Sequence, residues 1–251
     1  MKFIFFIVIL LSYNYAKADT LSVLTYNVNY HFINENIGDI LDSLDADIIC
    51  LQETNKKWEE IISKSSKKKY PFILFKHYGT AGGLAILSKY PIIRQNYLKN
   101  VVGWFPAWLI TVKRNNDIIQ LLNAHLKPKL TEKGRIGWKA FFKAEEIHIQ
   151  ELNQFVNELE LKLPIIILGD FNENDNGKMM QYLKNKMTFE HALSKFDKKS
   201  KTWRWVLLRG RYDHITFNNQ LTCIDAKVLK IGKSDHLPVL GKFTLKKNNI
   251  P

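Results

Sequence analysis

Short polar motifs stand at the boundaries of apolar segments at six places in this sequence. Carboxylate and amide oxygens are ligands that Mg²⁺ prefers, histidines transfer protons near neutral pH, and amides hydrogen-bond to phosphate oxygens. Scaffolds present functional groups rigidly where strands end, so we interpret the motifs as one site for magnesium-assisted phosphoryl chemistry. The motifs are Thr25-Tyr26-Asn27-Val28, Leu51-Gln52-Glu53-Thr54, Asn123-Ala124-His125-Leu126, Gly169-Asp170-Phe171-Asn172, Arg211-Tyr212-Asp213-His214 and Ser234-Asp235-His236-Leu237-Pro238.

Some of these residues support a physical argument of their own. Glu53 directly follows an apolar run, and an acid there is costly to bury unless it is paired or bound to a metal. Asp170 and Asn172 alternate along one extended segment, so both side chains are expected to face the same cleft. Asn27 alone has a plainer interpretation as a strand-end cap or turn former. The singly scattered histidines and two distant cysteines lack the spacing of a zinc site.

Apolar segments of strand and helix length position these motifs. Apolar residues recurring every three or four positions predict helices over residues 33–44, 58–65 and 136–161, the last ended by Pro164. A hairpin turn is predicted at residues 115–117. Because strands outnumber helices and both recur along the chain, we expect two packed sheets with helices outside. The predicted strands cover residues 21–28, 48–51, 72–75, 84–87, 107–112, 118–124, 165–168, 212–217, 221–229 and 237–245.

The first eighteen residues have the order of a secretory signal. Lys2 precedes an apolar run over residues 3–11, and a polar stretch then closes on Ala16-Lys17-Ala18. This run is shorter than the roughly 20 residues that cross a bilayer, which disfavours the alternative of a membrane anchor. We therefore expect residues 1–18 to be cleaved and residues 19–251 to form a secreted or periplasmic protein.

The mature chain is strongly basic. The full sequence carries a formal charge of +13, and loss of Lys2 and Lys17 with the signal leaves +11. This charge favours polyanions such as nucleic acid, although a lysine-rich surface can also serve solubility alone. The composition, 46% hydrophobic and 24% charged, argues against long disorder. We expect one monomeric domain and infer no protein partner.

Several other residues have plain structural interpretations. Cys50 lies in an apolar run, where cysteine usually serves as a small hydrophobe, so we do not expect a disulfide with Cys223. Trp203 and Trp205 lie close to Arg204, Arg209 and Arg211, so they could stack on bases or insert into lipid. Core packing is nevertheless the commoner fate of tryptophan. The histidines expected simply on the surface or in the core are His31, His77, His148, His191 and His214.

The motifs, taken in order, resemble the endonuclease/exonuclease/phosphatase superfamily. The shared pattern is strand-Asn, Leu-Gln-Glu, Asn-x-His-Leu, Gly-Asp-Phe-Asn and Ser-Asp-His-x-Pro, and it runs through almost all of the mature chain. This superfamily includes deoxyribonuclease I, abasic-site endonucleases, neutral sphingomyelinases and inositol polyphosphate 5-phosphatases. The resemblance implies a four-layered α/β sandwich of two mixed β-sheets with helices on the outer faces.

The resemblance also implies a ligand set for the cofactor. Carried over residue by residue, it makes Glu53, supported by Asn27 and Asp235, the holder of a catalytic Mg²⁺ or Mn²⁺ ion. It makes His236 the base that activates water, with Asp213 orienting its imidazole. That pairing is chemically sensible because a hydrogen-bonded acid fixes the tautomer of histidine and stabilises its charged form.

Three further residues complete the site that the resemblance implies. Asp170 and Asn172 position the nucleophile and bind phosphate, and His125 contacts the phosphate and can protonate the leaving oxygen. Catalysis is thus assigned to His236, Asp213, His125, Asp170 and Asn172, and substrate binding to Asn172 and His125.

These observations predict an exported, divalent-metal-dependent phosphodiesterase, with nucleic acid favoured as the substrate because of the positive charge. The sequence shows no insertion recognisable as a DNA-reading or abasic-site element, and the longer inositol phosphatase signature is only partly present. Two other classes stay open. One is a phosphomonoesterase or lipid phosphodiesterase at a membrane surface. The other, a non-catalytic polyanion-binding module, is disfavoured because every proton-transfer and metal position is retained.

Overall fold

Two six-stranded β-sheets pack against each other in the computed structural model, which describes residues 20–131 and 138–246. The first sheet has the order β13 (Leu221–Val228), β14 (Val239–Leu245), β1 (Thr20–Asn27), β2 (Ile48–Gln52), β4 (Leu84–Ser88), β3 (Phe72–Lys76). The second has the order β5 (Ile92–Leu98), β6 (Ala107–Arg114), β7 (Asp117–His125), β8 (Ile165–Asp170), β12 (Asp213–Phe217), β9 (Glu190–His191). The β1–β2 and β7–β8 pairs are parallel among otherwise antiparallel neighbours, so both sheets are mixed. The expected signal segment lies outside the described residues.

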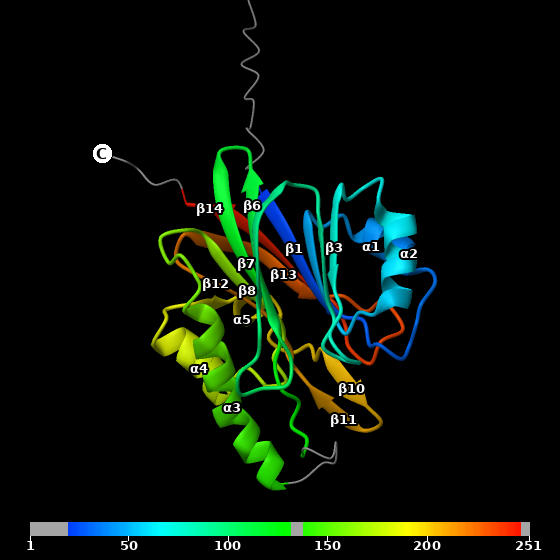
Figure 1. Ribbon diagram of the computed structural model, residues 1–251. Coiled ribbons are helices and arrows are strands. Elements are labelled where there is room, and N and C mark those ends of the chain that lie inside the picture. Colours follow the sequence, from blue (N-terminus) through cyan, green and yellow to red (C-terminus); the bar gives the residue numbers. More distant parts are fainter. Residues whose placement is uncertain (1–19, 132–137, 247–251) are drawn as a thin grey trace, which may run out of the picture.

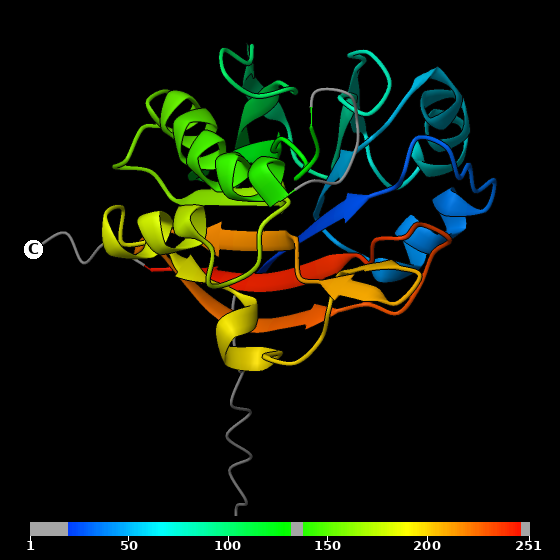
Figure 2. The same cartoon turned by 90° about the horizontal axis from the view of Figure 1, so that it is seen from below.

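Helices cover the outer face of each sheet, which gives four layers. In Figure 1, α1 (Ile37–Leu44) and α2 (Lys56–Ser66) lie on one side of the strands, and α3 (Trp138–Val156) and α4 (Lys178–Asn185) lie on the other. Figure 2 shows the same layers from below. The four-layered α/β sandwich expected from the sequence is therefore confirmed. Among the described residues, no helix has both the length and the apolar character to cross a membrane.

Alternating side chains build three apolar clusters from these layers. Along β1, Leu21 and Val23 face the space between the sheets, whereas Leu24 and Tyr26 pack under α1 and α2. The outer face of the second sheet packs against α3 and α4 in the same way. This two-residue period follows from the pleat of a strand and makes both faces of the central strands apolar. Cys50 and Cys223 are buried and free.

Some element boundaries differ from those predicted. The first helix begins at Ile37 and not at residue 33, because the Asn34 side chain accepts the Asn36 N–H in a turn before it. Helix α3 ends at Val156, well before Pro164, in i−3 hydrogen bonds such as Leu159 N–H to the Val156 carbonyl. The periodicity also missed β5, β9, α4, α5 (Leu193–Phe196) and the hairpin of β10 (Trp203–Trp205) and β11 (Leu208–Gly210).

Candidate active site

The carboxyl ends of four central strands meet at one end of the sandwich. Asn27 pairs with Gln52 across β1 and β2, and His125 pairs with Asp170 across β7 and β8. Asp213 opens β12 directly opposite Asp170. Asn27 joins the two sheets here, since its Nδ2 donates to Asp170 Oδ2 at 3.0 Å. The structure therefore brings the motifs of both sheets into one cluster.

Two carboxylates share the centre of this cluster with an amide and an imidazole. Asn27 Nδ2 also donates to Glu53 Oε1 at 2.9 Å. His125 Nε2 lies 3.6 Å from Asp170 Oδ2 and 4.0 Å from Glu53 Oε1. One ligand atom from each of Glu53, His125 and Asp170 lies within 4.8 Å of the other two. The carboxylates of Glu53 and Asp170 repel each other at this separation unless positive charge lies with them, so their oxygens fit a hard divalent cation.

Two of the predicted site residues have a left-handed backbone conformation, which sets the direction of their side chains. Glu53 has a φ of 59° and Asn172 a φ of 51°. The left-handed region costs a non-glycine residue about 1 kcal/mol or more, and such strain is characteristic of functional sites. Gly169 has a φ of 142°, and a Cβ there would lie 1.8 Å from the Ala124 carbonyl oxygen. Only glycine therefore lets β8 approach β7 so closely just before Asp170.

Asp235 is joined to the Glu53 cluster by hydrogen bonds that run through Asn29. Its Oδ1 accepts from Asn29 Nδ2 at 2.7 Å, and its Oδ2 accepts from Trp203 Nε1 at 3.0 Å. The Asn29 N–H in turn donates to Asn27 Oδ1 at 3.0 Å. No group of three close His, Cys, Asp or Glu ligands within the described residues includes Asp235. Asn29, which the sequence reasoning missed, links Asp235 to Asn27 and so to the Glu53 cluster, and the Asn-x-Asn spacing at the end of β1 was the available signal.

His236 and Asp213 form a buried hydrogen-bonded pair. His236 Nδ1 lies 2.8 Å from Asp213 Oδ2, and His236 Nε2 lies 3.5 Å from Asp170 Oδ2. Burial by itself would lower the pKa of His236, but Asp213, Asp170 and Asp235 outweigh it and raise that pKa to about 10. The imidazole is thus oriented with Nδ1 toward its carboxylate and Nε2 toward the cluster, as a general base requires.

Asn172 lies beside Asp170 for a different reason from the one expected. The strand β8 ends at Asp170, and the left-handed conformation of Asn172 breaks the extended alternation. The Asn172 N–H instead donates to Asp170 Oδ1 at 2.9 Å, and Asn172 Nδ2 donates to the Leu126 carbonyl at 3.0 Å. An amide Nδ2 carries two hydrogens, so Asn172 has a second one to donate to a ligand.

The His125 ring is held by a hydrogen bond at one nitrogen and by an aromatic ring stacked on one face. Its Nδ1 lies 3.1 Å from the Ala81 carbonyl oxygen, which places a proton on Nδ1, and the ring of Phe105 stacks on it at 4.4 Å. The remaining nitrogen, Nε2, points at Asp170. This geometry suits a group that contacts substrate through one defined nitrogen.

A second buried imidazole–carboxylate pair, His148 and Glu173, contacts the loops that follow His125 and Asp170. His148 Nδ1 lies 2.7 Å from Glu173 Oε2, and His148 Nε2 lies 2.7 Å from the Lys127 carbonyl. Glu173 Oε1 also accepts from the Met179 N–H at 2.7 Å. His148 is the core residue that the sequence allowed, but its partner Glu173, directly after Asn172, was missed. The pair ties the loop that follows His125 to the loop that follows Asp170.

The β10–β11 hairpin stands at the same end of the sandwich (Figures 1 and 2). Trp203 forms an isolated antiparallel bridge with His236, so the hairpin begins beside the His236–Asp213 pair. Its tip is exposed and apolar: Val206 is 80% and Leu207 is 90% exposed, and Trp205 and Leu208 are more than half exposed. The sequence reasoning considered Trp205 for substrate contact but did not single out the apolar tip beside it.

Comparisons with known proteins agree with this geometry. A family model described as the endonuclease/exonuclease/phosphatase family matches residues 24–236. No curated protein matches the sequence. Solved structures match the fold, including an endonuclease/exonuclease/phosphatase from Beutenbergia cavernae DSM 12333 with a TM-score of 0.73 at 14% identity, covering 90% of this chain and 72% of that one.

Two further solved structures match this chain over almost the whole of their own length. A functionally unknown conserved protein from Enterococcus faecalis V583 has a TM-score of 0.72 at 16% identity, over 90% of this chain and 100% of that chain. TDP2 from D. rerio, complexed with a single-strand DNA product, has a TM-score of 0.70 at 15% identity, over 90% and 99% of the two chains. At these identities the likeness is one of fold.

Proposed function

The chain belongs to the endonuclease/exonuclease/phosphatase family, and on that premise we propose that it is a divalent-metal-dependent phosphodiesterase that cleaves a P–O bond with activated water. The observation that carries this proposal is the meeting of the His236–Asp213 pair with Glu53, Asn27 and Asp170 at the strand ends. A base, its orienting acid and a cluster of hard oxygen ligands are the parts that such hydrolysis needs.

We assign the cation to Glu53, with Asn27 beside it. The carboxylates around His236 raise its pKa, so a base at this position requires compensating positive charge nearby. A divalent cation, Mg²⁺ or Mn²⁺, supplies that charge when bound and polarises the phosphate. Asp235 supports this cluster through its hydrogen bond with Asn29, whose N–H donates to Asn27 Oδ1.

Proton transfer belongs to the two imidazoles. His236 takes a proton from water at Nε2 while Asp213 holds Nδ1, and the water oxygen bonds to phosphorus as the P–O bond to the leaving group breaks. His125, when protonated at Nε2, returns a proton to the leaving oxygen. Asp170 positions the attacking water, and Asn172 hydrogen-bonds a phosphate oxygen.

Nucleic acid is the substrate class that we favour. The chain carries a formal charge of +13, which suits a phosphate backbone, and TDP2, one of its structural neighbours, was solved with a single-strand DNA product. The deciding experiment incubates the purified protein with DNA, RNA, sphingomyelin vesicles and inositol phosphates, in Mg²⁺ or Mn²⁺ and in chelator. We expect metal-dependent cleavage of nucleic acid. If the folded protein turns over no member of the panel, the enzyme is rejected in favour of a polyanion-binding module.

The β10–β11 hairpin favours a second candidate, a lipid phosphodiesterase acting at a membrane surface. Its apolar tip, next to Arg204 and Arg209, is suited to an anionic lipid interface beside the site. Leu207→Asp should then slow hydrolysis of vesicle substrates by about tenfold, because inserting one leucine side chain into the membrane contributes about 1.5 kcal/mol of binding free energy. Hydrolysis of soluble phosphodiesters should be unaffected. Leu161→Asp, also at an exposed leucine but distant in sequence, is the matched control. Equal loss in both variants would reject this candidate.

Export completes the proposal. The signal-like order of residues 1–18 supports a secreted or periplasmic protein, and the phosphate ester that we propose as its substrate would lie in the same compartment.

A further inference from the structure

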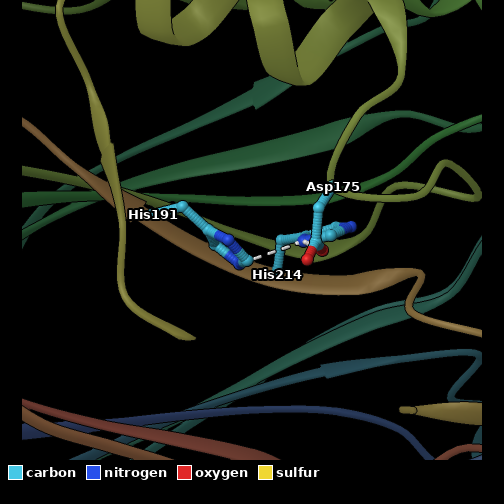
Figure 3. A group of neighbouring side chains, drawn as sticks. All are labelled: Asp175, His191 and His214. Carbon is cyan, nitrogen blue, oxygen red and sulfur yellow. Dashed lines mark hydrogen bonds and ion pairs between the residues drawn. The ribbon is translucent and has the colours of Figure 1, made fainter. Parts of the chain in front are cut away.

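Three potential metal ligands converge on the second sheet, away from the Glu53 cluster. His191 comes from β9, His214 from β12 and Asp175 from the loop that follows β8. His214 Nδ1 lies 3.1 Å from His191 Nε2 and 3.8 Å from Asp175 Oδ1. Figure 3 shows the side chains of His191 and Asp175 both approaching the His214 imidazole, with a dashed line joining His191 to His214. One ligand atom from each side chain lies within 4.8 Å of the other two.

The fully buried His214 is held in one orientation. Its Nε2 lies 2.7 Å from the Glu173 carbonyl oxygen, so the proton resides on Nε2 and the lone pair of Nδ1 faces the cluster. The ring of Phe171 stacks on it at 5.4 Å. A carbonyl behind a ligating imidazole is the usual arrangement that fixes the tautomer of a metal-binding histidine. Burial also lowers the pKa of both His191 and His214, which keeps them neutral.

Asp175 is exposed, and its two carboxylate oxygens contact different partners. Arg211 Nη1 lies 2.9 Å from Asp175 Oδ2 and holds the carboxylate in place, while Oδ1 is the oxygen turned toward His214. The exposure of Asp175 gives an ion a path from solvent, and the guanidinium charge opposes a cation and lowers its affinity.

This cluster is separate from the catalytic one because it uses the other face of β12. Successive side chains of a strand point to opposite faces. Asp213 faces His236, and Ile215 and Phe217 share its side in the space between the sheets. His214 therefore projects to the outer face of the second sheet.

We propose that Asp175, His191 and His214 form a second cation site, selective for a borderline transition ion such as Zn²⁺. In a tetrahedral zinc site with bonds of about 2.0–2.1 Å, neighbouring ligand atoms lie about 3.3–3.4 Å apart. The two separations measured from His214 Nδ1, 3.1 and 3.8 Å, bracket that value. Two imidazoles and one carboxylate favour Zn²⁺ over Mg²⁺, which prefers oxygen ligands.

The site has a structural role. An ion there joins β9 and β12 to the loop after β8, which carries Asn172 beside Asp170 and Glu173 to its partner His148. Binding therefore stabilises the folded protein and takes no part in the cleavage chemistry.

The test uses the full mature chain in Mg²⁺, with Co²⁺ as a spectroscopic probe and Zn²⁺ in calorimetric and thermal-unfolding titrations. We expect the wild type to bind Co²⁺ with the visible absorption of a low-coordinate site, and Zn²⁺ to raise its Tm. His191→Gln, at a partly exposed position on a strand edge, should weaken Zn²⁺ binding by at least about tenfold, since even outer partners of metal ligands contribute that much. Asp175→Asn, on the surface, is the second variant if His191→Gln fails to fold.

Two controls separate this site from others. Glu53→Gln removes the proposed catalytic ligand and should leave the Co²⁺ absorption unchanged, and His31→Gln removes an exposed histidine outside the cluster. If both cluster variants bind Zn²⁺ like the wild type, or if Glu53→Gln alone abolishes all Co²⁺ absorption, the second site does not exist. The three side chains would then form only a hydrogen-bonded and ionic cluster.

Discussion

His236 and Asp213 are joined tightly enough to act as one unit in turnover. Their side chains lie 2.8 Å apart and both are buried, so the role of each depends on the other. We would replace them with neutral residues of similar size, His236→Gln and Asp213→Asn, singly and together. His236→Ala is the poorer choice, because an unpaired buried carboxylate costs about 3–5 kcal/mol of stability.

The expected magnitude follows from the role of a general base. Such a group contributes roughly 10² to 10⁴ in rate, so each single variant should lower kcat by about 10³. If Asp213 works only by orienting and charging His236, the double variant should also lose about 10³ and not the product of about 10⁶. The difference corresponds to a coupling of about 4 kcal/mol in transition-state stabilisation.

The assay is a double-mutant cycle in kcat on whichever phosphodiester proves to be a substrate. Circular dichroism and Tm of every variant separate lost folding from lost chemistry. Matched controls come from the exposed pair His77 and Glu59, whose side chains lie 2.6 Å apart on the surface. His77→Gln and Glu59→Gln should leave kcat unchanged, since exposed pairs contribute little. Additive losses at His236 and Asp213, or near-normal turnover in His236→Gln, would refute the assignment of base and orienting acid.

Three further outcomes are expected. Chelator should abolish turnover and added Mg²⁺ or Mn²⁺ should restore it, with Glu53→Gln at least about 10²-fold slower at equal metal; full activity in excess chelator would remove the metal from the mechanism. The pKa of His236 is raised from 6.5 to about 10, so its contribution to stability is fully present below about pH 6.5 and is lost as pH rises through about 10. In chelator, the fall in Tm between pH 7 and 10 should therefore be smaller in Asp213→Asn than in the wild type. Equal falls in the two proteins would show that the His236–Asp213 pair is not the source of the pH dependence. Mass spectrometry of the exported protein should find an N-terminus near Asp19, and an intact Lys2 would contradict signal cleavage.

The fold could be predicted where the local pattern was strong. Apolar runs such as residues 48–51 and 165–168 became β2 and β8 because both of their faces are buried. The edge strand β5 was missed because it is largely exposed and carries Arg94, Gln95 and Asn96 in its middle. The short hairpin β10–β11 was missed because its apolar residues point to solvent and not to a core.

The sequence by itself determined which residue types reach the candidate active site, because each motif lies at or near the boundary of a strand that its own neighbours specify. Only the tertiary structure decided which of them touch. Asp235 lies beside Asn29 and Trp203, at sequence separations of 206 and 32 residues, and such contacts depend on how the two sheets are stacked. The same is true of His191 and His214, which look isolated in the sequence and are 23 residues apart. Antiparallel pairing of β9 with β12 brings them to one face of the sheet, where packing around the chain, and not spacing along it, makes them a pair.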